Sequence, residues 1–149
     1  MSAHGSAPGV PAVRIVRTFD ATADRLFDCF TNPADVARWW GPVGVRCPSA
    51  ENDLRIGGRF RFAMRADDGS IDTAACGEYL VIERPSRLVF TWAWEGAPDP
   101  ITRVSLTFTA VAANRTQLEL VHDRFDTDER AALHETGWGS CLDSLARVA

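Results

Sequence analysis

Residues 126–148 read DTDERAALHETGWGSCLDSLARV, and this stretch decides the fold. Apolar side chains recur in it at helical spacing, at Trp138, Cys141, Leu142, Leu145 and Val148. The spacing predicts a long C-terminal helix with one apolar side. The D-x-x-E pattern from Asp126 to Glu129 is that of a capping box and predicts where this helix begins. Because such a helix must cover another apolar surface, the rest of the chain has to supply one.

That surface is predicted between Val43 and Asp123, where the hydrophobic pattern has a period of two. The apolar side of the pattern is formed by Phe60, Phe62, Met64, Leu88, Phe90, Trp92, Trp94, Val104, Leu106, Phe108, Leu118, Leu120 and His122. Turn sequences such as residues 67–70 and 84–86 separate the strands. We therefore predict an antiparallel meander with one apolar face and one face in water.

The N-terminal part adds one strand and two short helices. Residues 13–19 alternate as a strand does, and residues 20–31 then change to helical spacing, with Asp20 or Thr22 as the cap. A second short helix begins at Pro33, which suits a first helical turn. This order predicts an α+β domain over residues 13–149, in which a curved antiparallel sheet of about six to seven strands surrounds the C-terminal helix. Residues 1–12 are expected to form a flexible leader.

The composition narrows the classes of function. With 149 residues, 46% of them hydrophobic, and a net charge of −4, the chain lacks the basic character of a nucleic-acid-binding domain. Arg55, Arg59, Arg61 and Arg65 form a basic stretch, which we interpret as the solvated face of a strand and not as a phosphate-binding patch. No stretch approaches the ~18 consecutive apolar residues of a membrane span. Four scattered cysteines favour a reducing, cytoplasmic location.

Two histidines are the polar residues best placed for chemistry. His122 shares the apolar side of its strand, and His134 precedes Trp138 by one helical turn. A buried imidazole needs hydrogen-bond partners, so each is either a satisfied core group or a group that orients a ligand. They are also the acid/base pair that an enzyme would use. Two histidines without a third ligand do not make a zinc site, and the sequence indicates no cofactor, no metal and no catalytic residue.

The many aromatic residues, together with two glycines in the C-terminal helix, suggest a cavity. Gly137 and Gly139 flank Trp138, where each lowers helix stability by about 1 kcal/mol relative to alanine. We interpret them either as allowing the helix to lie close against the sheet or as leaving room for a ligand. The residues predicted to bind the ligand are Trp39, Phe60, Phe62, Trp92, Trp94, Phe108, His122, His134 and Trp138.

Several short motifs together resemble the START-like superfamily. They are WWGP at 39–42, DLRIGGRF at 53–60, GEY at 77–79, RLVFTW at 87–92, and GW at 137–138 with LDSL at 142–145. Within this superfamily the chain is most similar to the branch named after the activator of the heat-shock-protein-ninety ATPase. The resemblance covers residues 13–148. It implies a helix-grip fold, with a deep cavity between a curved sheet and a long C-terminal helix.

The resemblance also implies a class of function. Related START-like domains bind lipids, polyketides, hormones and other apolar molecules, and a few cyclise or dehydrate polyketides. We therefore expect a non-catalytic domain that binds a small apolar or aromatic molecule between sheet and helix. The alternatives are a cyclase- or dehydratase-like enzyme that uses His122 and His134, and a co-chaperone-like domain that binds a protein. The expected partners are a small hydrophobic ligand and, beyond it, a second copy of the chain or a chaperone.

Overall fold

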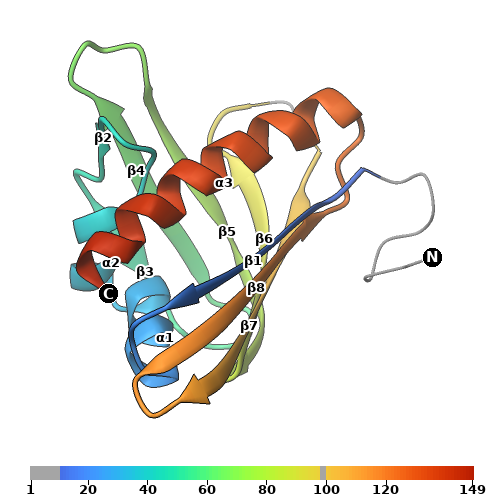
Figure 1. Ribbon diagram of the computed structural model, residues 1–149. Coiled ribbons are helices and arrows are strands. Elements are labelled where there is room, and N and C mark those ends of the chain that lie inside the picture. Colours follow the sequence, from blue (N-terminus) through green and yellow to red (C-terminus); the bar gives the residue numbers. More distant parts are fainter. Residues whose placement is uncertain (1–10, 98–99) are drawn as a thin grey trace.

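The computed structural model describes residues 11–97 and 100–149, which form one antiparallel sheet and three helices (Figure 1). The strands are β1 (Val13–Phe19), β2 (Val45–Arg46), β3 (Ala50–Asn52), β4 (Arg59–Ala66), β5 (Asp72–Glu83), β6 (Arg87–Trp94), β7 (Thr102–Ala112) and β8 (Arg115–Asp123). The helices are α1 (Ala23–Thr31), α2 (Pro33–Trp39) and α3 (Asp128–Val148). The leader predicted for residues 1–12 lies almost wholly outside the described residues.

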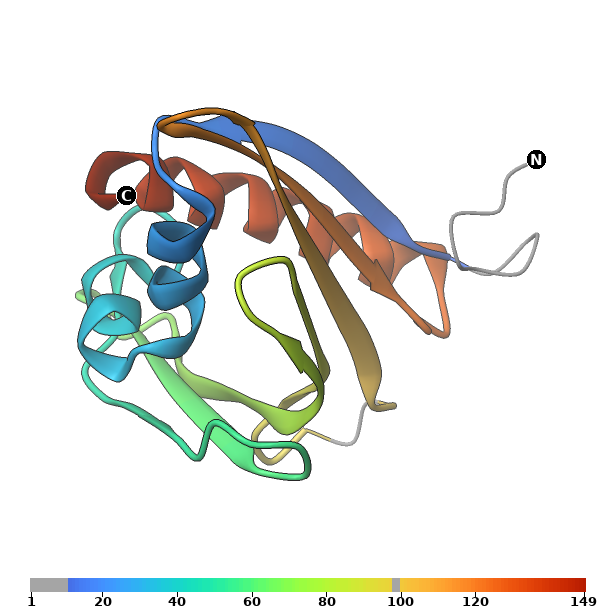
Figure 2. The ribbon, with the colours of Figure 1, turned by 90° about the horizontal axis from the view of Figure 1, so that it is seen from below.

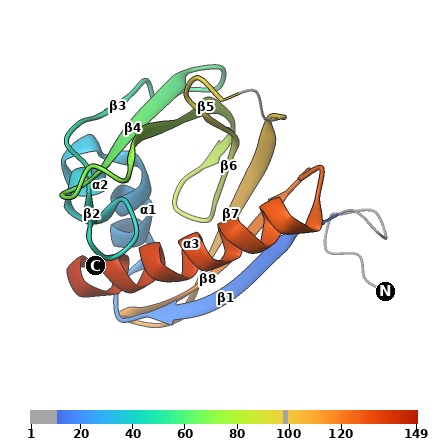
Figure 3. The ribbon, with the colours of Figure 1, turned by 90° about the horizontal axis from the view of Figure 1, so that it is seen from above.

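The sheet curls around α3, as the helix-grip prediction requires. Its strand order is β1-β8-β7-β6-β5-β4-β2, with β3 paired to β4, so the sheet has eight strands, two of them very short. Seen from below, the strands curve away from α3 and return to it, while α1 and α2 close one end (Figure 2). The backbone of α3 lies against β1 and α2, and it faces β4, β5 and β6, which lie farther from it (Figure 3). The predicted α+β fold is confirmed.

The helix caps show where local sequence signals succeed and where they fail. Thr22 caps α1, and Asn32 caps α2. At α3 the predicted capping box is wrong, because the cap is Thr127, whose hydroxyl accepts a hydrogen bond from the backbone N–H of Arg130 at 3.1 Å. The carboxylate of Asp126 instead pairs with the Arg130 guanidinium at 3.0 Å. A threonine one position nearer the helix therefore takes the cap, and Asp126 is left for a side-chain ion pair.

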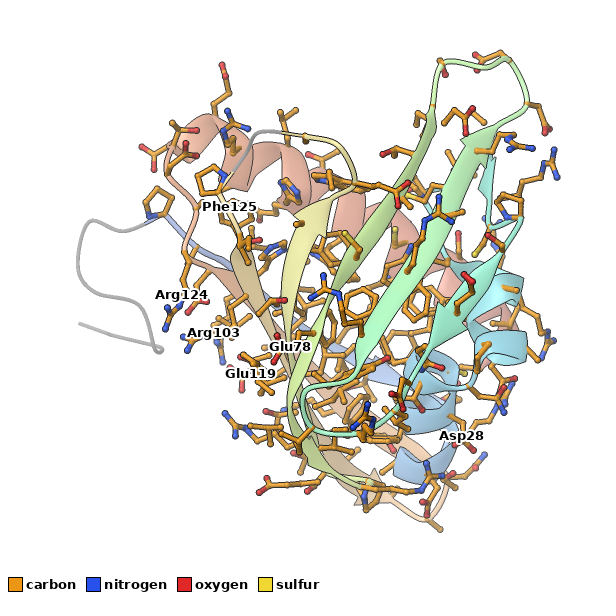
Figure 4. All side chains as sticks on the ribbon, turned by 180° about the vertical axis from the view of Figure 1, so that it is seen from behind. Asp28, Glu78, Arg103, Glu119, Arg124 and Phe125 are labelled. Carbon is orange, nitrogen blue, oxygen red and sulfur yellow. The ribbon has the colours of Figure 1, made fainter. Side chains whose placement is uncertain are left out.

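The two faces of the sheet differ as the period-two pattern predicts. Phe60, Phe62, Trp92 and Leu120 on the concave face are each less than 5% exposed. Charged residues occupy the convex face, where Glu78, Arg103 and Glu119 are seen from behind (Figure 4). Among the clustered arginines of β4 and the loop before it, three pair with carboxylates, in the pairs Arg55–Asp53, Arg61–Glu95 and Arg65–Asp72. No helix in the described part of the chain has the length and apolar character needed to span a membrane.

Gly77 in β5 allows a close backbone approach between β5 and β6. A Cβ atom at this position would lie 1.9 Å from the carbonyl oxygen of Thr91 on β6, so no other residue fits. The register between β5 and β6 also shifts by one residue between Tyr79 and Val81, which is a β-bulge. The close backbone approach and the bulge thus lie next to each other in the middle of β5, which begins at Asp72, before the predicted start at Gly77.

Replacement of Gly77 by alanine tests this close approach. The added methyl group forces the backbones of β5 and β6 apart, so we expect the free energy of unfolding to fall by about 1–3 kcal/mol or more. Gly139→Ala is the matched control, because a Cβ there meets nothing within 4 Å and alanine favours a helix interior, which should raise stability by about 1 kcal/mol. Urea unfolding of both variants measures the difference. A Gly77→Ala variant as stable as the parent would contradict it.

Candidate ligand-binding site

A cavity of about 440 Å³ lies between α3 and the concave face of the sheet. Its lining consists of Trp40, Pro42, Met64, Ile71, Thr73, Trp92, Trp94, Arg130, Leu133, His134, Gly137, Trp138 and Cys141. The wall is overwhelmingly apolar, and α3, β4, β5, β6 and the segment after α2 all contribute to it. Leu133 is 68% exposed and marks the side that is open to solvent.

Four indole rings dominate the wall. Trp92 lies at their centre, with ring centroids 5.2 Å from Trp138, 5.4 Å from Trp94 and 5.8 Å from Trp40. The rings are tilted or edge-on to one another, which is the arrangement that aromatic quadrupoles favour. The four rings therefore form a continuous rigid surface that reaches from α2 across β6 to α3.

The helix pair α1 and α2 positions Trp40. The indole N–H of Trp39 donates a hydrogen bond to the carbonyl oxygen of Cys29 at 2.8 Å, which ties α2 to α1. Trp40 caps the C-terminus of α2, and Gly41 follows with a φ of 110°, a value that glycine adopts without strain. The chain turns there, so the two adjacent tryptophans have different roles. Trp39 belongs to the packing between helices, and Trp40 reaches the cavity.

His122 ties α3 to the sheet through a chain of buried hydrogen bonds. The indole N–H of Trp138 donates to His122 Nδ1 at 3.0 Å, so the imidazole proton is on Nε2. That Nε2–H donates to the Thr102 hydroxyl at 2.7 Å, and the hydroxyl donates to the carbonyl oxygen of Trp92 at 3.2 Å. Burial, with the nearby His134 ring as a smaller cause, lowers the pKa of His122 from 6.5 to about 2. His122 is thus a neutral group with both ring nitrogens bonded.

His134 is held in the same manner at the edge of the cavity. The indole N–H of Trp94 donates to His134 Nε2 at 3.0 Å, and Nδ1–H donates to the carbonyl oxygen of Arg130 at 2.8 Å. The ring of Phe125, on the segment that leaves β8 for α3 (Figure 4), contacts both imidazoles, at 4.4 Å from His122 and 4.9 Å from His134, and the two imidazoles contact each other edge-on at 5.1 Å. The two histidines therefore lie close together without a hydrogen bond between them.

The glycines of α3 do not bring the helix close to the sheet. A Cβ atom at Gly137 or Gly139 would meet nothing within 4 Å, so the first of the two interpretations from sequence is wrong. The Trp138 indole, which stands between helix and sheet, holds the backbones apart. Gly137 lines the cavity, and its missing side chain leaves part of the space open.

The structure brings some of the predicted ligand-binding residues to the cavity and leaves others in the core. Trp92, Trp94, His134 and Trp138 line the cavity. Five predicted residues do not, and these are Trp39, Phe60, Phe62, Phe108 and His122. Phe60 and Phe62 join Tyr79 and Phe90 in a ring cluster, and Phe108 packs against Phe27 and Phe30 of α1. The end of the sheet near α1 is thus filled by rings.

Sequence reasoning missed other residues of the wall. Met64 lies on the strand face that was predicted to point inward, but nothing in the sequence distinguished it from an ordinary core residue. Ile71 and Thr73 belong to the hairpin and to the first part of β5, which the prediction began five residues too late. Within residues 11–97 and 100–149, no three His, Cys, Asp or Glu side chains are arranged to hold a metal ion.

The curled sheet, the long helix and the cavity between them define a START-like helix-grip domain. The family model described as "Activator of Hsp90 ATPase homolog 1-like protein" matches residues 20–149, and the chain belongs to this family. No curated protein matches the chain.

Solved structures extend the comparison. A protein of Chromobacterium violaceum is 26% identical, with a TM-score of 0.79 over 92% of this chain and 95% of its own. The AHSA1 protein of Silicibacter pomeroyi is 27% identical, with a TM-score of 0.79 over 91% of this chain and 95% of its own. An HSP90 activator from Plasmodium falciparum is 27% identical, with a TM-score of 0.61 over 78% of this chain and 74% of its own.

The buried neutral His122 predicts a pH dependence of stability. Below about pH 6.5 the unfolded chain binds a proton at this residue and the folded chain does not, so the stabilising contribution is complete above that pH and declines as the pH falls. We expect a loss of about 1.4 kcal/mol per pH unit from this residue between pH 6 and 5, measured by urea unfolding. His122→Gln retains a donor and an acceptor but does not titrate. The free energy of unfolding of His122→Gln should therefore lack this pH-dependent component. Equal slopes of unfolding free energy against pH for the variant and the parent would contradict a buried, neutral His122.

Proposed function

We propose that this protein binds a small apolar molecule in the cavity between α3 and the sheet and does not transform it. The observation that carries the proposal is the open space in front of Gly137, surrounded by the rings of Trp40, Trp92, Trp94 and Trp138. A volume of about 440 Å³ is in the range of small-molecule sites, which are mostly apolar with few polar groups. Family membership supports a ligand-binding role in general terms.

The hydrogen bonds of the two histidines support a non-catalytic role. General acid/base catalysis needs a ring nitrogen within reach of the reacting group. Both nitrogens of His122 are bonded inside the protein, to Trp138 and Thr102, and both nitrogens of His134 are bonded to Trp94 and Arg130. Neither imidazole can exchange a proton with a bound molecule without first breaking one of these bonds.

The proposal is tested with a neutral fluorescent probe, N-phenylnaphthylamine. The probe should bind saturably with one molecule per chain, and its fluorescence should rise as it leaves water. Gly137→Leu places a branched side chain into the cavity, so we expect affinity for the probe to fall at least ~10-fold, the change that ~1.4 kcal/mol produces.

Gly139→Leu is the matched control for this experiment. It adds the same side chain to the same helix at a position with open space that does not line the cavity, and binding should stay at the parent level. Circular dichroism establishes that both variants fold. Equal affinities of the two leucine variants would place the probe elsewhere, and the absence of saturable binding to the parent protein would refute the proposed function.

A co-chaperone activity is the second candidate. It is favoured by the likeness to the HSP90 activator from Plasmodium falciparum and by the family to which the chain belongs. The test is the ATPase rate of purified Hsp90 with and without this protein. A rate that rises with the concentration of this protein, and that is retained by Gly137→Leu, supports a protein-binding role independent of the cavity. An unchanged rate at saturating protein excludes stimulation of that Hsp90.

A further inference from the structure

We propose that the cavity selects a neutral, flat aromatic molecule with one oxygen atom that accepts a hydrogen bond, and that the hydroxyl of Thr73 positions this oxygen. The inference rests on the proposed function, because it names the class of molecule that the same cavity takes. Its basis is the set of polar groups in the cavity wall. Most of these groups are already bonded to the protein, and those that are not are the Thr73 hydroxyl, which can donate or accept, and two indole N–H groups, which only donate.

The bonded groups leave no site for a charged ligand. The Trp94 and Trp138 indoles and His134 use their nitrogens inside the protein, as described above. The Cys141 thiol bonds to the backbone of Gly41, and burial raises its pKa to about 12, so it remains a neutral thiol. Arg130 is the charged residue of the lining, and its guanidinium is 3.0 Å from the carboxylate of Asp126. Because Asp126 already balances the charge of Arg130, a carboxylate on the ligand would add an uncompensated negative charge among the indoles.

Thr73 is the side chain that remains available. It lies directly opposite Met64 in the antiparallel pair of β5 and β4, so both side chains point from the concave face into the cavity. Its hydroxyl makes no hydrogen bond within the described part of the protein. It is only partly buried, so a ligand can reach it. A hydroxyl that is free in an apolar wall fixes the orientation of a ligand oxygen.

Two further donors in the wall lack an acceptor. The Nε1–H groups of Trp40 and Trp92 are buried and have no partner, although both rings line the cavity. Buried polar groups are normally paired, and this pair of donors without acceptors gives the wall an excess of donors. A ligand oxygen complements that excess, whereas a ligand that only donates does not. Both N–H groups are shielded from solvent, so Thr73 is the donor that a ligand meets without movement of an indole.

The shape of the wall selects an aromatic molecule over an alkyl chain. Trp92 is at the centre of four rings whose planes are tilted or edge-on at 5.2–5.8 Å. A flat aromatic ligand adds further offset or edge-to-face contacts to this cluster, beyond the area that it buries. A flexible chain buries similar area but loses rotational freedom on binding. The wall therefore favours a flat aromatic molecule over an alkyl chain of equal size.

The test is displacement of N-phenylnaphthylamine by four molecules of similar size. Methyl naphthyl ketone has the ring and the oxygen, ethylnaphthalene lacks the oxygen, naphthoate carries a charge, and methyl decyl ketone has the oxygen on a chain. We expect the aromatic ketone to bind most tightly, by about 5-fold or more over each of the others. Thr73→Val, which keeps the shape of the side chain, should weaken the aromatic ketone about 3- to 10-fold and leave ethylnaphthalene within about 2-fold.

Thr109→Val is the control, because Thr109 is exposed on β7 and does not line the cavity. It should alter no affinity. Equal effects of Thr73→Val on the ketone and on ethylnaphthalene would remove Thr73 from the role assigned to it. Naphthoate or methyl decyl ketone binding as tightly as the aromatic ketone would overturn the selectivity while the proposed function stands. If N-phenylnaphthylamine itself fails to bind to the parent protein, both proposals fall.

Discussion

The hydrogen bond from the indole of Trp138 to His122 fixes the distance between α3 and the sheet, and the other features of the site depend on it. The ring extends from the middle of α3 to β8, and the bonds continue through Thr102 to the carbonyl oxygen of Trp92, so three strands and the helix share one buried chain of hydrogen bonds. Because a whole indole stands between the two backbones, the helix cannot approach the sheet at Gly137. The cavity is the consequence of that separation.

The concave face of the sheet has a filled end and a hollow end. Near α1, the rings of Phe27, Phe30 and Phe108 occupy the space between the sheet and the helices. Near the first half of α3, four indoles border a space that the protein leaves open. The polar groups around this space are bonded within the protein, except for the Thr73 hydroxyl and the indole N–H groups of Trp40 and Trp92. A neutral molecule that brings its own acceptor matches such a wall better than an ion or a substrate that needs a general base.

The sequence predicted the fold well because burial imposes a period on it. The alternation along β4, β6, β7 and β8 identified the buried faces, and the same parity placed His122 in the core, where it is 0% exposed. The distance between a helix and a sheet leaves no such period in the sequence. Gly137 has the same sequence signature whether a helix lies close to a sheet or stands away from it. Trp39 and Trp40 are adjacent and equally apolar, and only the end of α2 decides which of them reaches the cavity.

The most direct measurement is a crystal structure of this member of the family with N-phenylnaphthylamine bound. The account predicts density for the probe between α3 and the sheet, against Trp94 and in front of Gly137, with the Trp138–His122 hydrogen bond intact. Density for the probe on the outer surface, or a helix α3 that lies against β5 and β6 with no space at Gly137, would contradict it.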